Sequence, residues 1–207
     1  MKVKVCGIKY QENLEDLATL PVDMIGFNFY SQSKRFLQPN TRLNIEALPD
    51  SLAKVGVFVN ALPATLTEQQ KRYKLDYLQL HGDDDIEAVA TAKKIAKVIK
   101  VFRVNESFDF KLTEEFNSAD LFLFDTYTAH YGGSGKKFDW DLLNKYNGPT
   151  PFLLAGGLSK KDAEALREWT HPQLYGVDIN SGFEITPGLK DTNKVSQFLN
   201  KIKKQNL

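Results

Sequence analysis

The sequence has little that would support a covalent cross-link or a metal centre. Its 207 residues include one cysteine and three histidines. A single cysteine cannot form an internal disulfide, and it lacks the partner thiols of a cysteine-rich metal site. The histidines, at positions 81, 130 and 171, show no ligand spacing. We therefore expect neither a disulfide nor a bound metal.

The chain also lacks an excess of charge of either sign and any long hydrophobic run. Its 27 basic and 26 acidic residues give a formal net charge of +1. That balance creates no field for holding a polyanion, so we expect no nucleic-acid partner, and a bound anion would need a small local site. No apolar run approaches the roughly 18 residues of a membrane span, and the start MKVKVCGI has no signal-peptide pattern. The predicted location is the cytoplasm, without membrane association.

Apolar runs rich in β-branched residues alternate with amphipathic segments along the whole chain. Several runs are apolar on both parities, which is typical of parallel strands covered on both faces. The predicted strands are 2–8, 22–30, 53–60, 76–82, 97–104, 120–127, 151–157 and 174–182. The predicted helices are 12–20, 41–48, 64–74, 84–97, 108–117, 139–146, 159–169 and 191–204.

Eight strand–helix alternations without a break in composition predict an α/β fold, a single (βα)8 TIM-barrel domain over residues 1–207. A typical barrel of this kind has about 250 residues, so the helices here must be short and the insertions few. The alternative is a doubly wound open sheet, which more often has about five or six strands and a switch-point crevice. Periodicity favours the barrel but does not decide between the two folds.

Polar or glycine residues that end an apolar run are the candidate site residues, because the active site of a parallel barrel lies at the C-terminal ends of its strands. In this chain they are Cys6, Gly7, Asn28, Asn60, Gln79, His81, Arg103, Asp125, Thr126, Gly156, Gly157, Asp178, Asn180, Ser181 and Gly182. His81 is expected either to contact a ligand or to be satisfied by solvent or by a neighbour across the rim.

Cys6 ends the first predicted strand. It is either a small buried hydrophobic side chain, a frequent role of free cysteine, or a functional thiol. Gly7 follows directly and opens the backbone, and Lys4 lies two residues earlier on the same side of the strand. If Lys4 faces the barrel interior, we hypothesise that its charge helps to lower the thiol pKa from its usual value of about 8.5.

Asp125 ends the run LFLFD. A carboxylate after four apolar residues must be hydrogen-bonded, paired or protonated. It either caps the next turn or acts as a proton donor whose pKa is raised by its apolar setting. On the first and sixth strands, Cys6 and Asp125 would approach a shared ligand from opposite sides.

Glycines that end the last two strands predict a phosphate site. Gly156 and Gly157 lead into a helix, for which Ser159 is a candidate N-cap, and Ser181 and Gly182 follow the eighth strand. Many barrels hold a phosphate between these two loops and a helix N-terminus.

Two further loops are candidates for ligand contact. The glycine-rich segment 132–137 lacks the spacing of a nucleotide phosphate loop, so we interpret it as a lid or as a plain flexible loop. Arg35, after the second strand, is a candidate clamp because a guanidinium binds a carboxylate in a bidentate fork. The alternative for Arg35 is a solvated surface residue.

Several segments together resemble motifs of the phosphoribosylanthranilate isomerase family. In chain order between residues 2 and 191 they are KVCGI, GFNFYSQSKRF, VGVFVN, LQLHG, LFDT, GGSGKKFDW, LLAGGL, GVDINSGFE and PGLKD. The resemblance implies an enzyme of tryptophan biosynthesis that converts N-(5′-phosphoribosyl)anthranilate to the carboxyphenylamino-deoxyribulose phosphate by an Amadori rearrangement. It implies a small phosphorylated substrate and no cofactor; we expect a monomer or a homodimer.

The resemblance also implies roles for individual residues. Cys6 matches the general base that takes the C2′ proton, and Asp125 matches the general acid that protonates the ribose ring oxygen. Arg35 matches the arginine that binds the anthranilate carboxylate. The remaining matches are a polar residue that lines the pocket, Asp178, and the phosphate-binding loops, Gly156, Gly157, Ser181 and Gly182.

The chain departs from the family pattern after the second strand. It has Asn28 and the segment 31–33 where the family often has a proline and an apolar residue. Related barrels that isomerise the histidine-pathway substrate use an aspartate base on the first strand, so Cys6 argues against that activity. Two alternatives are another phosphosugar isomerase, which would not require both Cys6 and Arg35, and a barrel that binds a phosphometabolite without converting it.

Overall fold

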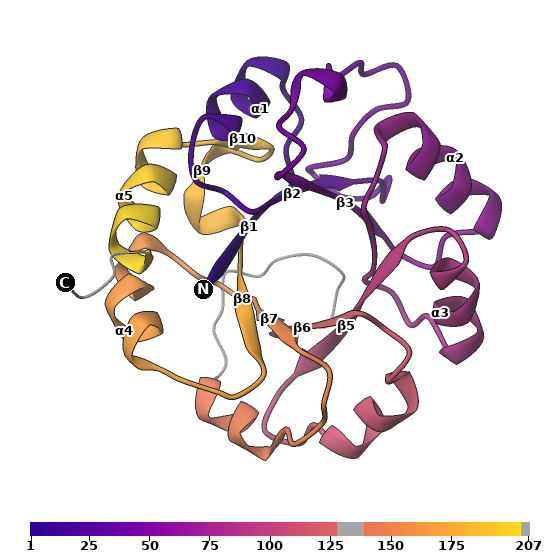
Figure 1. Ribbon diagram of the computed structural model, residues 1–207, viewed down its shortest axis with the longest axis vertical. Coiled ribbons are helices and arrows are strands. Elements are labelled where there is room, and N and C mark those ends of the chain that lie inside the picture. Colours follow the sequence, from indigo (N-terminus) through magenta and orange to yellow (C-terminus); the bar gives the residue numbers. More distant parts are fainter. Residues whose placement is uncertain (128–138, 204–207) are drawn as a thin grey trace.

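Eight parallel strands close into a barrel in a computed structural model that describes residues 1–127 and 139–203 (Figure 1). The first strand pairs with both the second and the eighth, which closes the sheet, so the open-sheet alternative is wrong and the predicted barrel is confirmed. The strands are β1 (Lys2–Cys6), β2 (Met24–Asn28), β3 (Ala53–Phe58), β4 (Tyr77–Leu80), β5 (Lys97–Val104), β6 (Leu121–Thr126), β7 (Phe152–Leu154) and β8 (Leu174–Ile179).

The helices around the barrel are short, as the chain length predicts. The α-helices are α1 (Gln11–Ala18), α2 (Pro63–Tyr73), α3 (Ile86–Lys93), α4 (Ala163–Glu168) and α5 (Thr192–Ile202). Five further segments are 3-10 helices: η1 (Ile45–Ala47), η2 (Phe110–Phe116), η3 (Trp140–Lys145), η4 (Lys160–Asp162) and η5 (Ser181–Phe183). The helices predicted after the second, fifth and sixth strands are therefore only 3-10 segments.

Local hydrogen bonds explain where the clearest helices begin. The Asp85 carboxylate accepts from the Ala88 backbone N at 2.8 Å and caps α3. The backbone N and the hydroxyl of Ser159 both donate to Asp162 Oδ2, at 2.7 and 2.9 Å, which confirms Ser159 as the start of the helical segment η4–α4.

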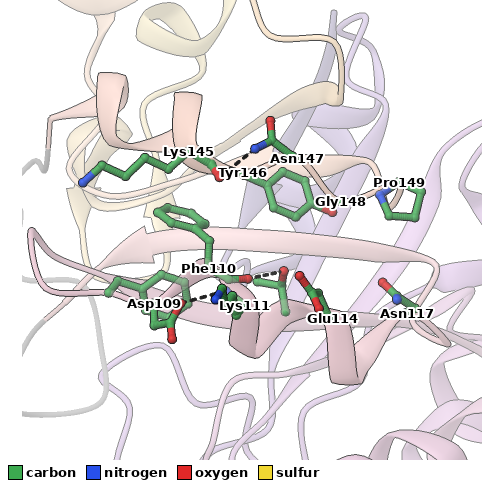
Figure 2. Close-up of a pocket in the computed structure, with 12 residues that line it drawn as sticks. Asp109, Phe110, Lys111, Glu114, Asn117, Lys145, Tyr146, Asn147, Gly148 and Pro149 are labelled. Carbon is green, nitrogen blue, oxygen red and sulfur yellow. Dashed lines mark hydrogen bonds between the residues drawn. The ribbon is translucent and has the colours of Figure 1, made fainter.

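Aromatic side chains cover β5 and β6, where the helical segments are short. Phe102 on β5 packs its ring 5.6 Å from that of Phe116, and Phe124 on β6 lies 5.8 Å from Phe110 and 5.3 Å from Tyr146. Between η2 and the end of η3 a groove of about 640 Å³ remains on the outer surface. Figure 2 shows Phe110 and Tyr146 in this groove, together with charged side chains such as Lys111 and Glu114.

The core has two parts, because strand side chains alternate between the barrel interior and the helix-covered outside. The interior cluster comprises Met24, Val55, Ile99, Val101, Leu121, Leu123, Leu153 and Ala155. The larger cluster lies between strands and helices. Because Leu121 and Leu123 face the interior, the next residue of the same parity, Asp125, faces it too, at the upper end of β6. The packing of the strands thus directs their last polar residues into one space.

A hairpin that the sequence did not predict follows the eighth strand. The predicted strand 174–182 ends at Ile179, and β9 (Glu184–Thr186) pairs antiparallel with β10 (Leu189–Lys190) beside α1 (Figure 1). Asn13 of α1 binds the Lys190 backbone in both directions, donating to its carbonyl at 2.9 Å and accepting from its N at 2.8 Å. In the two described ranges, no helix has the length and apolarity that crossing a membrane requires.

Candidate active site

A cavity lies at the C-terminal end of the barrel, where the sequence placed the site. Its described lining is Cys6, Asn28, Ser33, Arg35, Val57, Gln79, His81, Asp125, Ala155, Gly156, Gly157, Leu158, Asp178, Asn180 and Ser181. Every candidate residue matched by the family resemblance lies in this lining except Gly182. Asn60 and Arg103 point elsewhere: the Asn60 side chain accepts from the Asp83 backbone N at 2.9 Å, and Arg103 forms an ion pair with the Asp83 carboxylate.

Cys6 is buried at the end of β1, with 5% of its surface exposed. A Cβ on Gly26 of β2 would approach the Cys6 Sγ to 2.8 Å, so the thiol occupies space that this glycine leaves. Burial raises the pKa of the thiol, although the charges of Lys4 and Lys190 oppose the rise. Desolvation of the thiolate outweighs the neighbouring cations, so the pKa of the thiol lies above its ordinary value, while the charge of Lys4 acts to lower it in the hypothesised direction.

Lys4 faces the barrel interior, where its ammonium lies 2.9 Å from Asp178 Oδ2 of the neighbouring strand β8. Both side chains are almost completely buried. Burial alone would lower the pKa of Lys4, but Asp178 and Cys6 outweigh it and raise the pKa. The second oxygen of Asp178, Oδ1, is buried and has no hydrogen-bond partner among the described residues. It therefore offers a ligand hydroxyl an acceptor at the cavity wall.

Asp125 makes a local cap and also lines the cavity. Its Oδ1 accepts from the Thr126 backbone N at 2.8 Å, which is the predicted local cap, while the side chain also lines the cavity. Its Oδ2 lies 3.6 Å from His81 Nε2, beyond direct hydrogen-bond distance. The Gln79 amide lies 3.1 Å from His81 Nδ1. When that amide donates, the imidazole carries its proton on Nε2, toward Asp125.

Arg35 is held in a two-pronged ion pair with Glu184 of β9. Arg35 Nε donates to Oε1 at 2.8 Å, and Nη2 donates to Oε2 at 2.6 Å. The Arg35 and Glu184 side chains are only 13% and 6% exposed, so the alternative of a solvated surface arginine is wrong. Glu184 Oε1 also accepts from Lys190 Nζ at 2.7 Å and from the Gly188 N at 3.0 Å.

Glu184 and Lys190 form the charged cluster behind Arg35 that residue-level sequence reasoning missed. Burial would raise the pKa of Glu184, but the bonds from Arg35, Lys190 and Gly188 lower it to about 2. Burial lowers the pKa of Lys190 to about 8 against the attraction of Glu184. Neither residue ends an apolar strand. Their only signal in the sequence is their place in the motifs GVDINSGFE and PGLKD.

The two predicted phosphate loops meet at one side of the cavity. Gly156 and Gly157 adopt φ values of +92° and +61°, and a Cβ on Gly156 would lie 2.2 Å from Thr126 Oγ1. Gly182 lies outside the described lining and packs against the next loop: a Cβ there would lie 2.2 Å from the Leu158 carbonyl oxygen. Gly182 therefore brings the two loops together.

Two further expectations from the sequence concern the loop after the sixth strand and the binding of a metal ion. The predicted lid 132–137 and His130 lie outside the described residues. Within residues 1–127 and 139–203, no group of three or more histidine, cysteine, aspartate or glutamate side chains is arranged to hold a metal ion.

Comparison with known proteins identifies the family of this chain. The family model for N-(5′-phosphoribosyl)anthranilate isomerase matches residues 3–201. The N-(5′-phosphoribosyl)anthranilate isomerase of Parabacteroides distasonis is 46% identical over 206 residues, which cover 98% of this chain and 93% of the relative. That of Phocaeicola vulgatus is 38% identical over 207 residues, covering 99% of each chain.

Solved structures agree. The crystal structure of phosphoribosyl anthranilate isomerase from Thermotoga maritima is similar with a TM-score of 0.86 and 32% identity, covering 98% of both chains. A phosphoribosyl anthranilate isomerase in complex with reduced 1-(o-carboxyphenylamino)-1-deoxyribulose 5-phosphate has a TM-score of 0.83 and 28% identity, with the same coverage. The similarity therefore extends over nearly the whole chain and its fold.

Proposed function

The chain belongs to the N-(5′-phosphoribosyl)anthranilate isomerase family, and we propose that Cys6 is its general base and Asp125 its general acid. The substrate is N-(5′-phosphoribosyl)anthranilate, and the product is 1-(2-carboxyphenylamino)-1-deoxyribulose 5-phosphate. The reaction is an Amadori rearrangement in tryptophan biosynthesis.

One observation carries the assignment of roles: Cys6, Asp125, Arg35 and the two glycine loops line the same cavity. An aldose–ketose shift needs one acid, one base and an anchor at each end of the substrate. The cavity offers a thiol and a carboxyl group on different strands, a guanidinium at one side and the paired loops at another. This set fits the substrate better than it fits a phosphosugar without an aromatic acid, which would not need Arg35.

The proposed steps move two protons between these groups and the substrate. Asp125 donates a proton to the ribose ring oxygen as the bond from C1′ to that oxygen breaks, and the anilino nitrogen forms a C1′=N double bond. The Cys6 thiolate then takes the C2′ proton. The electrons of the C2′–H bond form a C1′=C2′ double bond and restore the nitrogen lone pair. The resulting enolamine gains a proton at C1′ from water and loses the proton of its C2′ hydroxyl, so that the C2′ ketone forms.

The remaining residues bind and orient the substrate in this proposal. Gly156, Gly157 and Ser181 hold the phosphate with the backbone of their loops, and Gly182 keeps the loops together. Asp178 Oδ1 accepts a hydrogen bond from a sugar hydroxyl, and His81 donates one to or accepts one from another hydroxyl. The anthranilate ring occupies the adjoining cavity of about 350 Å³, whose walls include Tyr30, Val59 and Pro187 and which Arg35 also lines.

Turnover of N-(5′-phosphoribosyl)anthranilate by matched variants tests the proposal. Cys6→Ser and Asp125→Asn should each lower kcat by roughly 100- to 10,000-fold, because each removes one proton-transfer group. Glu164→Gln is the control, since Glu164 pairs with Lys201 on the exposed helix surface. Near wild-type rates in both catalytic variants would refute the roles. Binding of the reduced product without any turnover by the wild type would instead indicate a barrel that binds without converting.

We further propose that residues 1–207 form one domain that is a monomer or a homodimer. A related isomerase from Thermotoga maritima is described as dimeric and has been converted to monomers, so both states occur in proteins of this fold. Sedimentation equilibrium measures the state directly. A single cooperative unfolding transition at fixed protein concentration is expected for one domain, and two separated transitions would contradict it.

A further inference from the structure

We infer that Glu184 and Lys190 are positioning residues for Arg35, and that they set the guanidinium edge that selects substrates with an aryl carboxylate. The inference rests on the proposed function, in which Arg35 binds the anthranilate carboxylate. Glu184 and Lys190 act through Arg35, so they bear on recognition of one end of the substrate.

The fork between Arg35 and Glu184 determines which guanidinium donors are left. Arginine has five N–H donors, and Glu184 uses one on Nε and one on Nη2. Among residues 1–127 and 139–203, no partner is found for the two donors on Nη1 or the second one on Nη2, which lie along the adjacent edge. Arg35 lines both the barrel cavity and the adjoining one, so this edge is the part of the group that a ligand carboxylate can meet in bidentate geometry.

Glu184 is itself fixed by more than its bond to Arg35. Its Oε1 accepts from the Lys190 ammonium at 2.7 Å and from the Gly188 N at 3.0 Å. The Lys190 ammonium is fully buried and also donates to Asn180 Oδ1 at 2.6 Å. These bonds join β9, β10 and the loop after β8, so rotation of the carboxylate would break several of them at once.

Gly7, which follows Cys6, leaves room for the Arg35 side chain. Gly7 has a φ of +82°, and a Cβ there would come within 2.6 Å of Arg35 Cδ and 3.1 Å of Asn180 Oδ1. The arginine stem therefore passes directly over the residue that follows the Cys6 thiol. The Lys190 backbone is held in turn by Asn13 of α1, which itself is 4% exposed. Arg35 is thereby fixed relative to the strand that carries the proposed base.

The cluster formed by Arg35, Glu184 and Lys190 has a net charge of +1. Arg35 and Lys190 are cations, and Glu184 is the single carboxylate between them, whereas the deeper pair of Lys4 and Asp178 is balanced. A buried excess charge is costly unless it is paired. A ligand carboxylate at Arg35 completes the pairing. A ligand without a carboxylate leaves the excess positive charge unpaired. The cluster therefore contributes to selectivity between ligands as well as to affinity.

Binding of two probes separates this role from a general structural one. The first probe is reduced 1-(o-carboxyphenylamino)-1-deoxyribulose 5-phosphate, and the second is the same compound without its carboxyl group. Glu184→Gln should weaken binding of the first by roughly tenfold or more, because the neutral amide no longer holds Arg35 in the two-pronged ion pair and this loss of orientation outweighs the added positive charge. The affinity for the second should change less than about twofold, within the error expected for an untouched site. In kinetics, KM should rise while kcat stays near the wild-type value.

Control variants distinguish failure of this inference from failure of the proposed function. Glu164→Gln should bind both probes like the wild type. Arg35→Ala should lose the distinction between the probes; if it retains the distinction, the proposed role of Arg35 is wrong. If Arg35→Ala loses it but Glu184→Gln binds both probes as the wild type does, weakens both equally or binds the first more tightly, the positioning role is overturned. Lys190→Met, with the same expected selectivity loss, decides the matter if Glu184→Gln does not fold.

Discussion

Glu184 should make the folded protein sensitive to acid through its own ionisation. The carboxyl group has a pKa of about 2 in the folded chain against an ordinary value of 4.5, and its side chain is only 6% exposed. A lowered pKa stabilises the fold fully above the unfolded value, and the stabilisation is lost as the pH falls through the folded value. The difference corresponds to about 3 kcal/mol at pH 7, of which roughly 1.4 kcal/mol remains at pH 3.

Urea unfolding of the wild type and of Glu184→Gln at a series of pH values isolates this contribution. Hydrogen-bond and packing changes in the variant are nearly independent of pH, whereas the lost ionisation is not. The difference in free energy of unfolding between the two proteins should therefore shrink by about 2 kcal/mol between pH 7 and pH 3. Glu164→Gln, which removes one partner of an exposed ion pair, should show no comparable trend.

A pH-independent difference between wild type and Glu184→Gln would refute this reasoning. It would mean that the ionisation of Glu184 is matched in the unfolded chain, so the bonds from Arg35 and Lys190 would not stabilise its charge. If the wild type unfolds too far at the lowest pH for a baseline, the same trend should already be visible near pH 4. There the calculated loss is roughly 0.8 kcal/mol.

Three further changes have expected outcomes. Lys4→Met should move the inflection in the rate of Cys6 alkylation by iodoacetamide to higher pH, since the Lys4 charge lowers the thiol pKa; an unchanged profile would contradict this. Gly156→Ala should lower stability by about 1–3 kcal/mol, because its φ is +92° and the new methyl group meets Thr126 Oγ1; an unchanged melting temperature would show that the loop relaxes. Phe124→Ala should cost about 3–5 kcal/mol in urea unfolding, because the ring is fully buried among other aromatic rings. A loss near 1 kcal/mol would mean that neighbouring rings fill the space.

The strands could be predicted from the sequence because burial on both faces leaves a strong local pattern. The alternation that places Leu121 and Leu123 in the barrel interior also directs Asp125 there. The packing of the core therefore determines where this site residue lies. The same rule selected Arg103 and Asn60, which the structure turns toward Asp83. A strand-end rule identifies the rim of the barrel but does not say which rim residues find a closer partner.

Contacts between distant segments could not be predicted from local patterns. Glu184 meets Arg35 across 149 positions of the chain, and the hairpin that carries it has strands of three and two residues. Such short strands have no measurable periodicity. The rise in the pKa of the Cys6 thiol could not be predicted for the same reason. Lys4 is close to Cys6 in the sequence, but how deeply both residues are buried depends on closure of the barrel.

The 3-10 segments over β5 and β6 show a related limit. The sequence predicted helices at 108–117 and 139–146, and the chain forms η2 and η3 there instead. Rings such as Phe110 and Tyr146 fill the layer that longer helices would occupy, so fewer turns suffice to cover the strands.

Pairing of β1 with β8 has a consequence for synthesis of the chain on the ribosome. The Lys4–Asp178 bond joins residues 174 positions apart, and Asn13 meets Lys190 across 177 positions. Until the last strand emerges and docks, Lys4 has no counter-charge and the sheet keeps two open edges. The Cys6 thiol, which we propose as the general base, therefore acquires its environment only in the final step of assembly, so in an incomplete nascent chain it is an ordinary cysteine.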